Sequence, residues 1–172
     1  MNNNLIIKER NKFLMILPPD FTNILNKFEE SIDNRLIKNS PIDLPNNVTI
    51  KSFKFKREGF FGNTQIFEYK TLKNKNILTY NEKGCFPVNP KYTPVVTTSV
   101  NFDKQVLKMI KYFHKKFGTN PSICDGEWYE FRATLSNGQK LKSEGYNYFP
   151  KTYYRFIDYL EQLVINQNLE NE

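Results

Sequence analysis

The chain has 172 residues, of which 25 are lysine or arginine and 18 are aspartate or glutamate, so its formal charge is +7. A chain of this length is typical of one domain that buries its own core without a metal or a disulfide. The modest glycine and proline content argues against a disordered or fibrous chain. No apolar stretch approaches the roughly 20 residues that cross a bilayer as a helix.

The cysteines and the N-terminal segment favour a cytoplasmic protein with no membrane partner. Cys85 and Cys124 form no Cys-x-x-Cys motif, and the sequence leaves open whether they pair. Two thiols in a chain of this length are not the framework of a secreted disulfide scaffold. The apolar run at 13–17 stops at Pro18 and Pro19, which makes it shorter than the apolar region of a signal peptide.

The first third of the chain predicts a helix, a loop and a strand. Residues 20–37 carry apolar side chains at helical spacing, with Asp20 placed to cap the helix. Residues 39–47 hold two prolines and several turn formers, which predict a loop. Residues 48–57 alternate as a strand, but Phe53 and Phe55 have the opposite parity to Val48 and Ile50, so we expect a β-bulge near Ser52.

The middle of the chain predicts two short strands, an irregular segment and a helix. The strands are expected at 65–70 and 77–80. Residues 83–101 contain Pro87, Pro90 and Pro94 with little periodicity, which predicts a long loop. Residues 102–117 place apolar side chains on one helical face, and Gly118 is expected to end that helix.

The last third predicts a hairpin followed by a helix. A strand at 127–135 and a return strand at 139–144 are joined by Ser136, Asn137 and Gly138, a strong hairpin signal. Pro150 is expected at the first position of the final helix, and residues 166–172 form a polar tail. Together these elements predict an α+β protein with an antiparallel sheet of about five strands and three amphipathic helices on one face.

Two stretches of the sequence resemble each other and suggest an internal pseudo-repeat. Residues 67–70 (FEYK) align with residues 129–132 (YEFR), and each stretch is followed by a predicted hairpin and, later, a helix. The domain prediction is therefore a single α+β domain over 1–172, with tandem strand–strand–helix units at 48–117 and 125–165. Chance similarity within a composition rich in asparagine, lysine and aromatic residues is the alternative.

No motif for catalysis, metal binding or a cofactor is found. The single histidine, His114, cannot form a histidine-rich metal site, and the scattered glycines make no phosphate-binding loop. Glu68 and Lys70 match the second half of a metal-dependent nuclease motif, but Asp20, Asp33 and Asp43 are poor candidates for its upstream aspartate. We therefore expect a protein that is not an enzyme and has no cofactor, with a metal-dependent nuclease as a remote alternative.

Basic and aromatic side chains are the candidate binding residues. Lys104, Lys108, Lys111 and Lys115 follow helical spacing and predict a lysine stripe opposite the apolar face of the 102–117 helix. Residues 59–63 predict a turn, in which Phe60 and Phe61 are expected to be exposed. A second basic set, on the predicted strand at 48–57, contains Lys54, Lys56 and Arg57. Strand alternation predicts that Lys54 and Lys56 point away from the face that Phe53 and Phe55 share.

These features favour a protein that acts through its surface. The first hypothesis is a non-catalytic protein of the immunity, inhibitor or regulator kind, whose partner is another protein with complementary charge. It rests on the basic cluster at 51–76 and on acidic clusters at 20–33 and 151–172. The alternative is a nucleic-acid-associated protein that contacts the phosphate backbone through the lysine stripe. Lysines that merely keep the protein soluble would give the same composition.

Overall fold

The computed structural model describes residues 36–37, 39–59, 62–73, 75–84, 93–97, 100–119 and 126–170, all within the compact unit Leu36–Glu172. Side chains are described for these residues except 37, 93–97, 100 and 167–170. Several predictions fall outside this part of the chain, namely those on residues 13–17, residues 20–35, Phe60, Phe61, Cys85 and Cys124. The single domain over 1–172 and its tandem units stay predictions.

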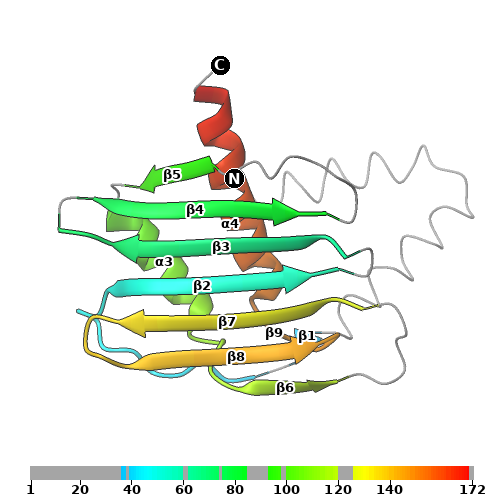
Figure 1. Cartoon of the computed structure of the whole chain (residues 1–172). Helices are drawn as coiled ribbons and strands as arrows, with labels where there is room; N and C mark the ends of the chain where they lie inside the picture. The colour runs from blue at the N-terminus through cyan, green and yellow to red at the C-terminus, as the bar shows by residue number, and fades with distance from the viewer. Residues whose placement is uncertain are drawn as a thin grey trace, which may run out of the picture. The chain divides into compact units, whose positions relative to one another are not determined.

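Most of the described strands form one seven-stranded sheet in the order β5-β4-β3-β2-β7-β8-β6 (Figure 1). The strands are β2 (Ile50–Glu58), β3 (Thr64–Thr71), β4 (Asn76–Lys83), β5 (Thr93–Thr97), β6 (Lys116–Thr119), β7 (Trp128–Leu135) and β8 (Lys140–Tyr146). Neighbouring strands are antiparallel except β6 and β8. The sheet is therefore mixed and larger than the antiparallel sheet of about five strands that we predicted.

Strand β5 was missed because prolines dominate its surroundings. Thr93–Thr97 pairs with β4, with Val95 opposite Leu78 and Pro94 opposite Thr79. Proline has no N–H to donate to a neighbouring strand, so central strands exclude it, but an edge strand tolerates it. The prediction of a loop over 83–101 is thus wrong for these five residues, which form the edge of the sheet.

The bulge in β2 is confirmed. The pairing of β2 with β7 shifts between Ile50, which is opposite Leu135, and Ser52, which is opposite Thr134. The shift brings Ile50 and Phe53 to the same side of the sheet, where both are buried. At the bulge, the Ile50 amide donates a hydrogen bond to Asp103 Oδ2 at 3.4 Å.

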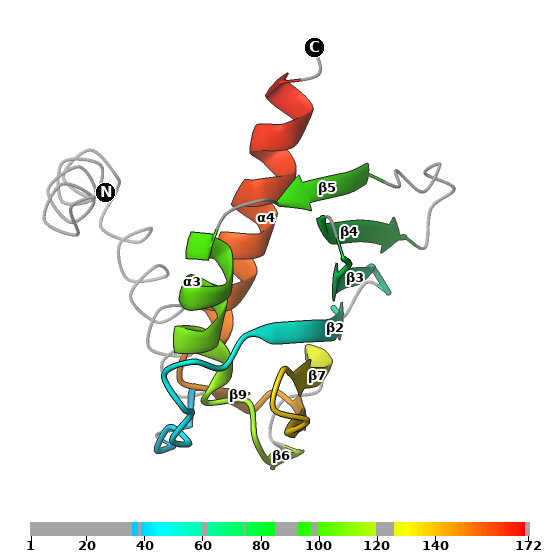
Figure 2. The ribbon, with the colours of Figure 1, turned by 90° about the vertical axis from the view of Figure 1, so that its left-hand side faces the viewer.

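The described helices, α3 (Val100–Ile110) and α4 (Tyr153–Glu170), lie on the same side of the sheet, as Figure 2 shows edge-on. The α+β class is therefore confirmed, with two helices in the described part of the chain. Residues 36–37 belong to a short strand, β1 (Leu36–Ile37), which pairs in parallel with β9 (Phe149–Pro150). This corrects the C-terminal end of the 20–37 helix. Pro150 also precedes α4 instead of opening it, and α4 extends to Glu170, into the predicted tail.

Helix α3 ends at Ile110, well before the predicted end at Phe117. The backbone carbonyl groups at its C-terminus accept hydrogen bonds from distant segments of the chain. Thr152 Oγ1 donates to Met109 O at 2.8 Å, and the Ile42 amide donates to Lys111 O at 2.9 Å. Asn39 Nδ2 donates to Tyr112 O, also at 2.8 Å. These bonds satisfy carbonyls that a longer helix would have paired internally.

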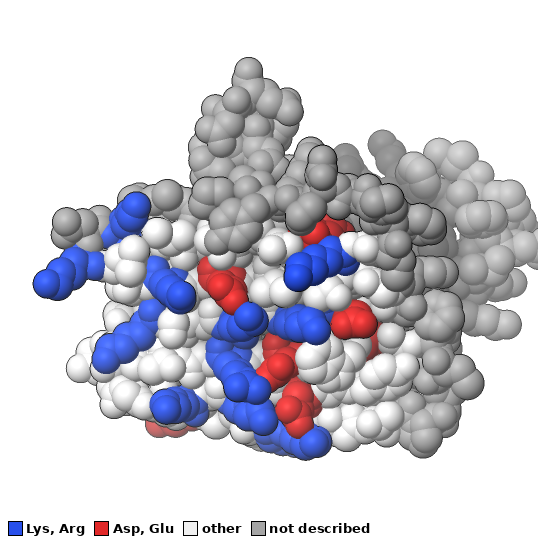
Figure 3. Space-filling view, in the orientation of Figure 1, with Lys and Arg blue, Asp and Glu red and all other residues white. Residues whose placement is uncertain are grey.

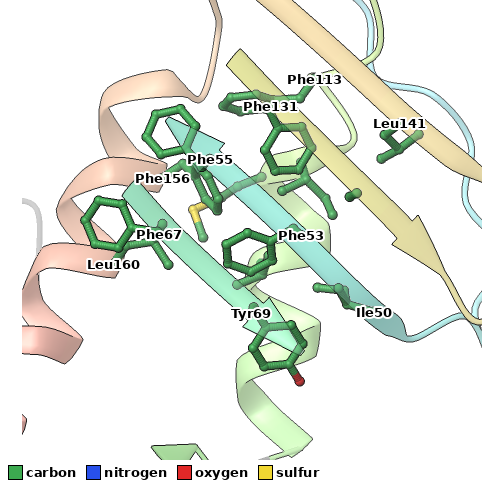
Figure 4. Packing of buried hydrophobic residues seen from close by; sticks show 14 of the residues in the cluster. Ile50, Phe53, Phe55, Phe67, Tyr69, Phe113, Phe131, Leu141, Phe156 and Leu160 are labelled. Atoms are coloured by element: carbon green, nitrogen blue, oxygen red, sulfur yellow. The ribbon is translucent and has the colours of Figure 1, made fainter. Parts of the chain in front are cut away.

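Aromatic rings fill the space between the sheet and the two helices (Figure 4). Phe55 of β2 is central, with its ring centroid 6.3 Å from that of Phe67 on β3 and 5.4 Å from that of Phe156 on α4. Phe113 follows α3 and is fully buried, with its ring 4.9 Å from that of Phe131 on β7. This core fixes the orientation of the central strands, so that alternate residues of β2, β3 and β7 point to the opposite face of the sheet.

Candidate binding surface

A row of charged side chains crosses the face of the sheet opposite α3 and α4, which we call the open face. Lys54 of β2 is level with Glu68 of β3 on one side and Arg132 of β7 on the other. Arg132 is in turn level with Lys142 of β8. The first row therefore reads Glu68, Lys54, Arg132, Lys142 across four strands, with cations on three neighbouring strands.

A second row lies two residues further along each strand, closer to the β3–β4 and β7–β8 turns. Ser52 is level with Lys70 of β3 and with Thr134 of β7, and Thr134 is level with Lys140 of β8. Two small hydroxyl residues thus lie between two lysines. A shallow depression of about 220 Å³ is found here, and Ser52, Thr134, Lys54, Lys70 and Arg132 are among the residues that line it.

The cations of these two rows form a patch that we call the basic band. Its members are Lys54, Lys70, Arg132, Lys140 and Lys142. Two further exposed lysines, Lys73 and Lys75, follow β3 in the turn beside it. Figure 3 shows the open face, with blue side chains over the part near these turns and red side chains mainly toward its centre and right.

Ion pairs on the basic band are exposed and therefore weak. Lys54 Nζ lies 2.6 Å from Glu68 Oε1, and the Lys54 side chain is 55% exposed. Arg132 pairs with Glu130 of its own strand and is 65% exposed. Pairs of this kind contribute roughly 0–1 kcal/mol in water. No ion pair within the described residues involves Lys70 or Lys140.

The next row of the open face carries both signs, with two glutamates between two lysines. Glu130 is level with Lys56 on β2 and with Glu144 on β8, and Glu144 is level with Lys116 on β6. A hydrogen bond from Lys116 Nζ, 2.8 Å from Glu144 Oε1, is the main reason why the pKa of the Glu144 carboxyl is lowered from its usual value. The open face is thus divided into a basic band and, beside it, a row of mixed charge that we call the mixed strip.

Aromatic side chains border the mixed strip on the side away from the basic band. Trp128 of β7 is level with Tyr146 of β8, and both are half-buried. The Lys56 ammonium lies 4.9 Å from the centre of the Trp128 ring, a cation–π contact. Lys56 also lines a depression together with Lys54, Glu130 and Arg132, so it adjoins the basic band.

Arg57 lies on the helix side of β2, where it contacts other elements of the fold, whereas Lys54 lies on the open face. Its Nε donates to Gln65 Oε1 at 2.5 Å, and its NH2 group lies 2.7 Å from Glu161 Oε1 on α4. Its NH1 group is 3.4 Å from Glu127 Oε1, which also accepts a 2.6 Å hydrogen bond from the Tyr153 hydroxyl. We call these five residues the Arg57 network, which joins β2, β3 and α4 at one end of the core.

Burial raises the pKa of several tyrosines on the helix side. Desolvation is the main cause for Tyr69, whose pKa rises to about 12, and for Tyr129 and Tyr153, whose pKa values are also raised. The Tyr69 hydroxyl donates to Asp103 Oδ1 at 2.9 Å, and this carboxylate also disfavours the tyrosinate. These hydroxyl groups therefore remain protonated. Each one is hydrogen-bonded to a polar side chain at the edge of the core.

The structure separates the predicted binding residues. Lys104 and Lys108 are exposed on α3, on the helix side of the sheet, whereas Lys54 and Lys56 belong to the open face. The four-lysine helical stripe is not formed, because α3 ends before Lys111 and Lys115. Arg57 belongs to the Arg57 network instead of an exposed patch, and Phe60 and Phe61 lie outside the described residues. Strand pairing brings Lys70 and Arg132 to Lys54, and neither was among the predicted binding residues.

The described residues hold no cluster of three or more His, Cys, Asp or Glu side chains that could bind a metal ion. Glu68 pairs with Lys54 and lies on the open face with Lys70. The nitrogen Nε2 of His114 lies 3.0 Å from the Ser40 carbonyl oxygen, so the imidazole ring contacts the loop that contains Ser40. Within the described helices, none has the length and apolar character needed to cross a membrane.

Comparison with known proteins gives one partial likeness. The chain is similar to a threonine–tRNA ligase from Campylobacter hominis, with 33% identity over 110 residues, which is 63% of this chain and 17% of the ligase. No protein-family model and no solved structure matches the chain. Because the chain spans only 17% of the ligase, the likeness assigns neither a family nor the ligase activity to it.

Proposed function

We propose that this chain is a non-catalytic binding protein that recognises another protein, of the immunity, inhibitor or regulator kind, through the open face of its sheet. The observation that carries the proposal is the basic band, in which Lys54, Arg132 and Lys142 lie level on three neighbouring strands. Both described helices pack on the other face, so these side chains are exposed to solvent. We also propose that the protein works in the cytoplasm, because two cysteines are too few for a secreted disulfide scaffold.

A protein partner suits the division of the open face into a basic zone and a zone of mixed charge. The basic band is followed by a strip that contains Glu130 and Glu144, and then by Trp128 and Tyr146. Two protein surfaces with complementary charge patterns steer each other into one orientation and exclude partners with the wrong pattern. Aromatic side chains at the margin supply the large apolar contacts that protein interfaces favour.

Nucleic acid is the second candidate partner, favoured by the basic band and by the partial likeness to a protein that is named a tRNA ligase. If all five cations of the band contacted phosphates, the logarithm of the binding constant would fall with the logarithm of salt with a slope of about −3.5 for a single strand. The two glutamates of the mixed strip are the argument against this candidate, because Glu130 and Glu144 would repel a phosphate backbone that passed over them.

The test is affinity capture by the full chain and two charge-reversal variants. Lys70→Glu/Lys140→Glu changes the basic band, and Lys104→Glu/Lys108→Glu makes the same charge change on α3 as a matched control. We expect the unchanged protein and the control to retain the same protein partner after nuclease treatment, and the band variant to lose it. Equal capture by all three would refute the proposed surface, and loss of every partner on nuclease treatment would favour nucleic acid.

A further inference from the structure

The charges of the open face are arranged differently along the strands and across them. Along a strand, at most two cations follow each other on this face: β2 carries Lys54 and Lys56, and β8 carries Lys140 and Lys142, whereas the sign changes on β3 and β7. Across the strands, three cations lie level, from Lys54 to Arg132 to Lys142. A ligand with a line of like charges therefore meets the longest level row of cations when it crosses the strands at a steep angle.

The spacing of the cations matches the turns of an α-helix. Neighbouring strands are about 4.8 Å apart. A helix that presents one side chain per turn repeats every ~5.4 Å, whereas an extended strand repeats its same-face residues every ~6.6 Å. Over the two steps from Lys54 on β2 to Lys142 on β8, the mismatch is about 1 Å for a helix and about 4 Å for an extended segment. The flexible stems of Lys54 and Lys142 can absorb the smaller mismatch.

A shallow depression in the open face can accommodate such a helix. The two rows of the basic band lie about 6.6 Å apart, the rise of two residues along a strand. Between the lysines of the second row, Ser52 and Thr134 are small, and the depression lies over them. Their hydroxyl groups can donate hydrogen bonds to a carboxylate that points down between the rows.

Resting on the function proposed above, we propose that the basic band binds an acidic α-helix of the partner protein, laid across β3, β2, β7 and β8 with about one carboxylate per turn. Glu130 and Glu144 face the flank of that helix and require it to be neutral or basic there. The partner helix therefore has one narrow acidic face. The exposed pairs of Lys54 and Arg132 contribute little, so a partner carboxylate joins them at small cost.

Fluorescence anisotropy with the full-length protein tests this geometry. The first probe is a labelled alanine-rich peptide of roughly 18 residues, about five helical turns, with glutamates at i, i+4, i+7 and i+11. The second probe has the same composition with the glutamates distributed around the helix, and the third is an oligouridine. We expect the first peptide to bind at least tenfold more tightly than the second, and to lose at least tenfold with Lys70→Glu/Lys140→Glu but not with Lys104→Glu/Lys108→Glu.

Each other outcome overturns a different part of the argument. Equal binding of the two peptides would refute the helix geometry but leave an acidic protein partner in place. Absence of peptide binding, together with capture of a protein partner that depends on the basic band, would refute the acidic helix and retain the proposed function. Oligouridine binding that is tighter than both peptides and depends on Lys70 and Lys140 would refute the helix and the protein partner together.

Discussion

Replacement of Arg57 by methionine tests whether the two faces of β2 use their cations differently. Arg57 is 23% exposed and contacts Gln65, Glu127 and Glu161, so its removal leaves two partly buried carboxylates without their cation. Methionine keeps much of the apolar stem and removes only the guanidinium. Lys54→Met, on the open face of the same strand, is the matched control, because Lys54 is 55% exposed and pairs only with Glu68 among the described residues.

The contacts of Arg57 set the size of the effect. A hydrogen bond to a charged group contributes roughly 1.5–3 kcal/mol, and an exposed ion pair contributes about 0–1 kcal/mol. We therefore expect Arg57→Met to lower the free energy of unfolding by about 2–3 kcal/mol, and Lys54→Met by less than about 1 kcal/mol. For a chain of this length, each kcal/mol shifts Tm by about 2–4 °C, so the Arg57 variant should melt about 4–12 °C lower.

Urea and thermal unfolding, followed by far-ultraviolet circular dichroism, measure both variants against the unchanged protein. The reasoning predicts that the Arg57 variant loses clearly more stability than the Lys54 variant, with similar m-values. Equal losses for the two variants would show that the Arg57 network contributes no more than a surface ion pair, and would refute the argument.

Three further predictions concern the core and its ends. Above about pH 10 the free energy of unfolding should fall by about 1.4 kcal/mol per pH unit for each buried tyrosine. The reason is that a tyrosine in the unfolded chain loses its proton near pH 10, whereas burial raises the pKa of Tyr69 in the folded protein to about 12. Tyrosinate absorbance and circular dichroism should therefore change together, and full ionisation of all 10 tyrosines near pH 10 in a native-like protein would contradict this. Gly126→Ala should cost about 1–3 kcal/mol in urea unfolding, because its Cβ would lie 2.1 Å from Asn147 Nδ2, whereas Gly118→Ala has open space and should cost less. Asp103→Ala should cost about 1–3 kcal/mol in the same measurement, since it removes the acceptor of Tyr69 and of the bulged Ile50 amide; a loss near zero would refute that role.

Local features of β2 and of the last hairpin were predictable because they depend on residues that are close in sequence. The parity change between Ile50 and Phe53 showed the bulge, since only a register shift buries both side chains. The turn at Ser136–Gly138 needs a residue at positive φ, and Gly138 adopts a φ of 84° there. In both places the sequence signal and the tertiary structure agree.

The end of α3 and the strand β6 were not predictable from neighbouring residues. Phe113 and Phe117 continue the helical spacing of α3 and are buried as expected, but Phe117 is buried as part of a strand. Hydrogen bonds from Asn39 and Thr152 stop the helix, and both residues are distant in sequence. Only the assembled fold shows these bonds, so a pattern of apolar residues could not locate the helix end.

The candidate surface was predictable only strand by strand. Alternation around Phe53 and Phe55 correctly assigned Lys54 and Lys56 to the face away from the core. That Arg132 and Lys142 lie level with Lys54 depends on strand order and register, which the separate strands do not reveal. Arg57 was grouped with Lys54 because the two are neighbours in sequence, although β-strand alternation places them on opposite faces.

Lysine acetylation of the purified complex tests the central claim most directly, because it shows which face the partner covers. The reaction is carried out on the free protein and on the complex, and the modified lysines are quantified by mass spectrometry. Binding through the basic band predicts that Lys54, Lys70, Lys140 and Lys142 become protected, while Lys104 and Lys108 react equally in both samples. Protection of Lys104 and Lys108, with unchanged reaction on the basic band, would contradict the account.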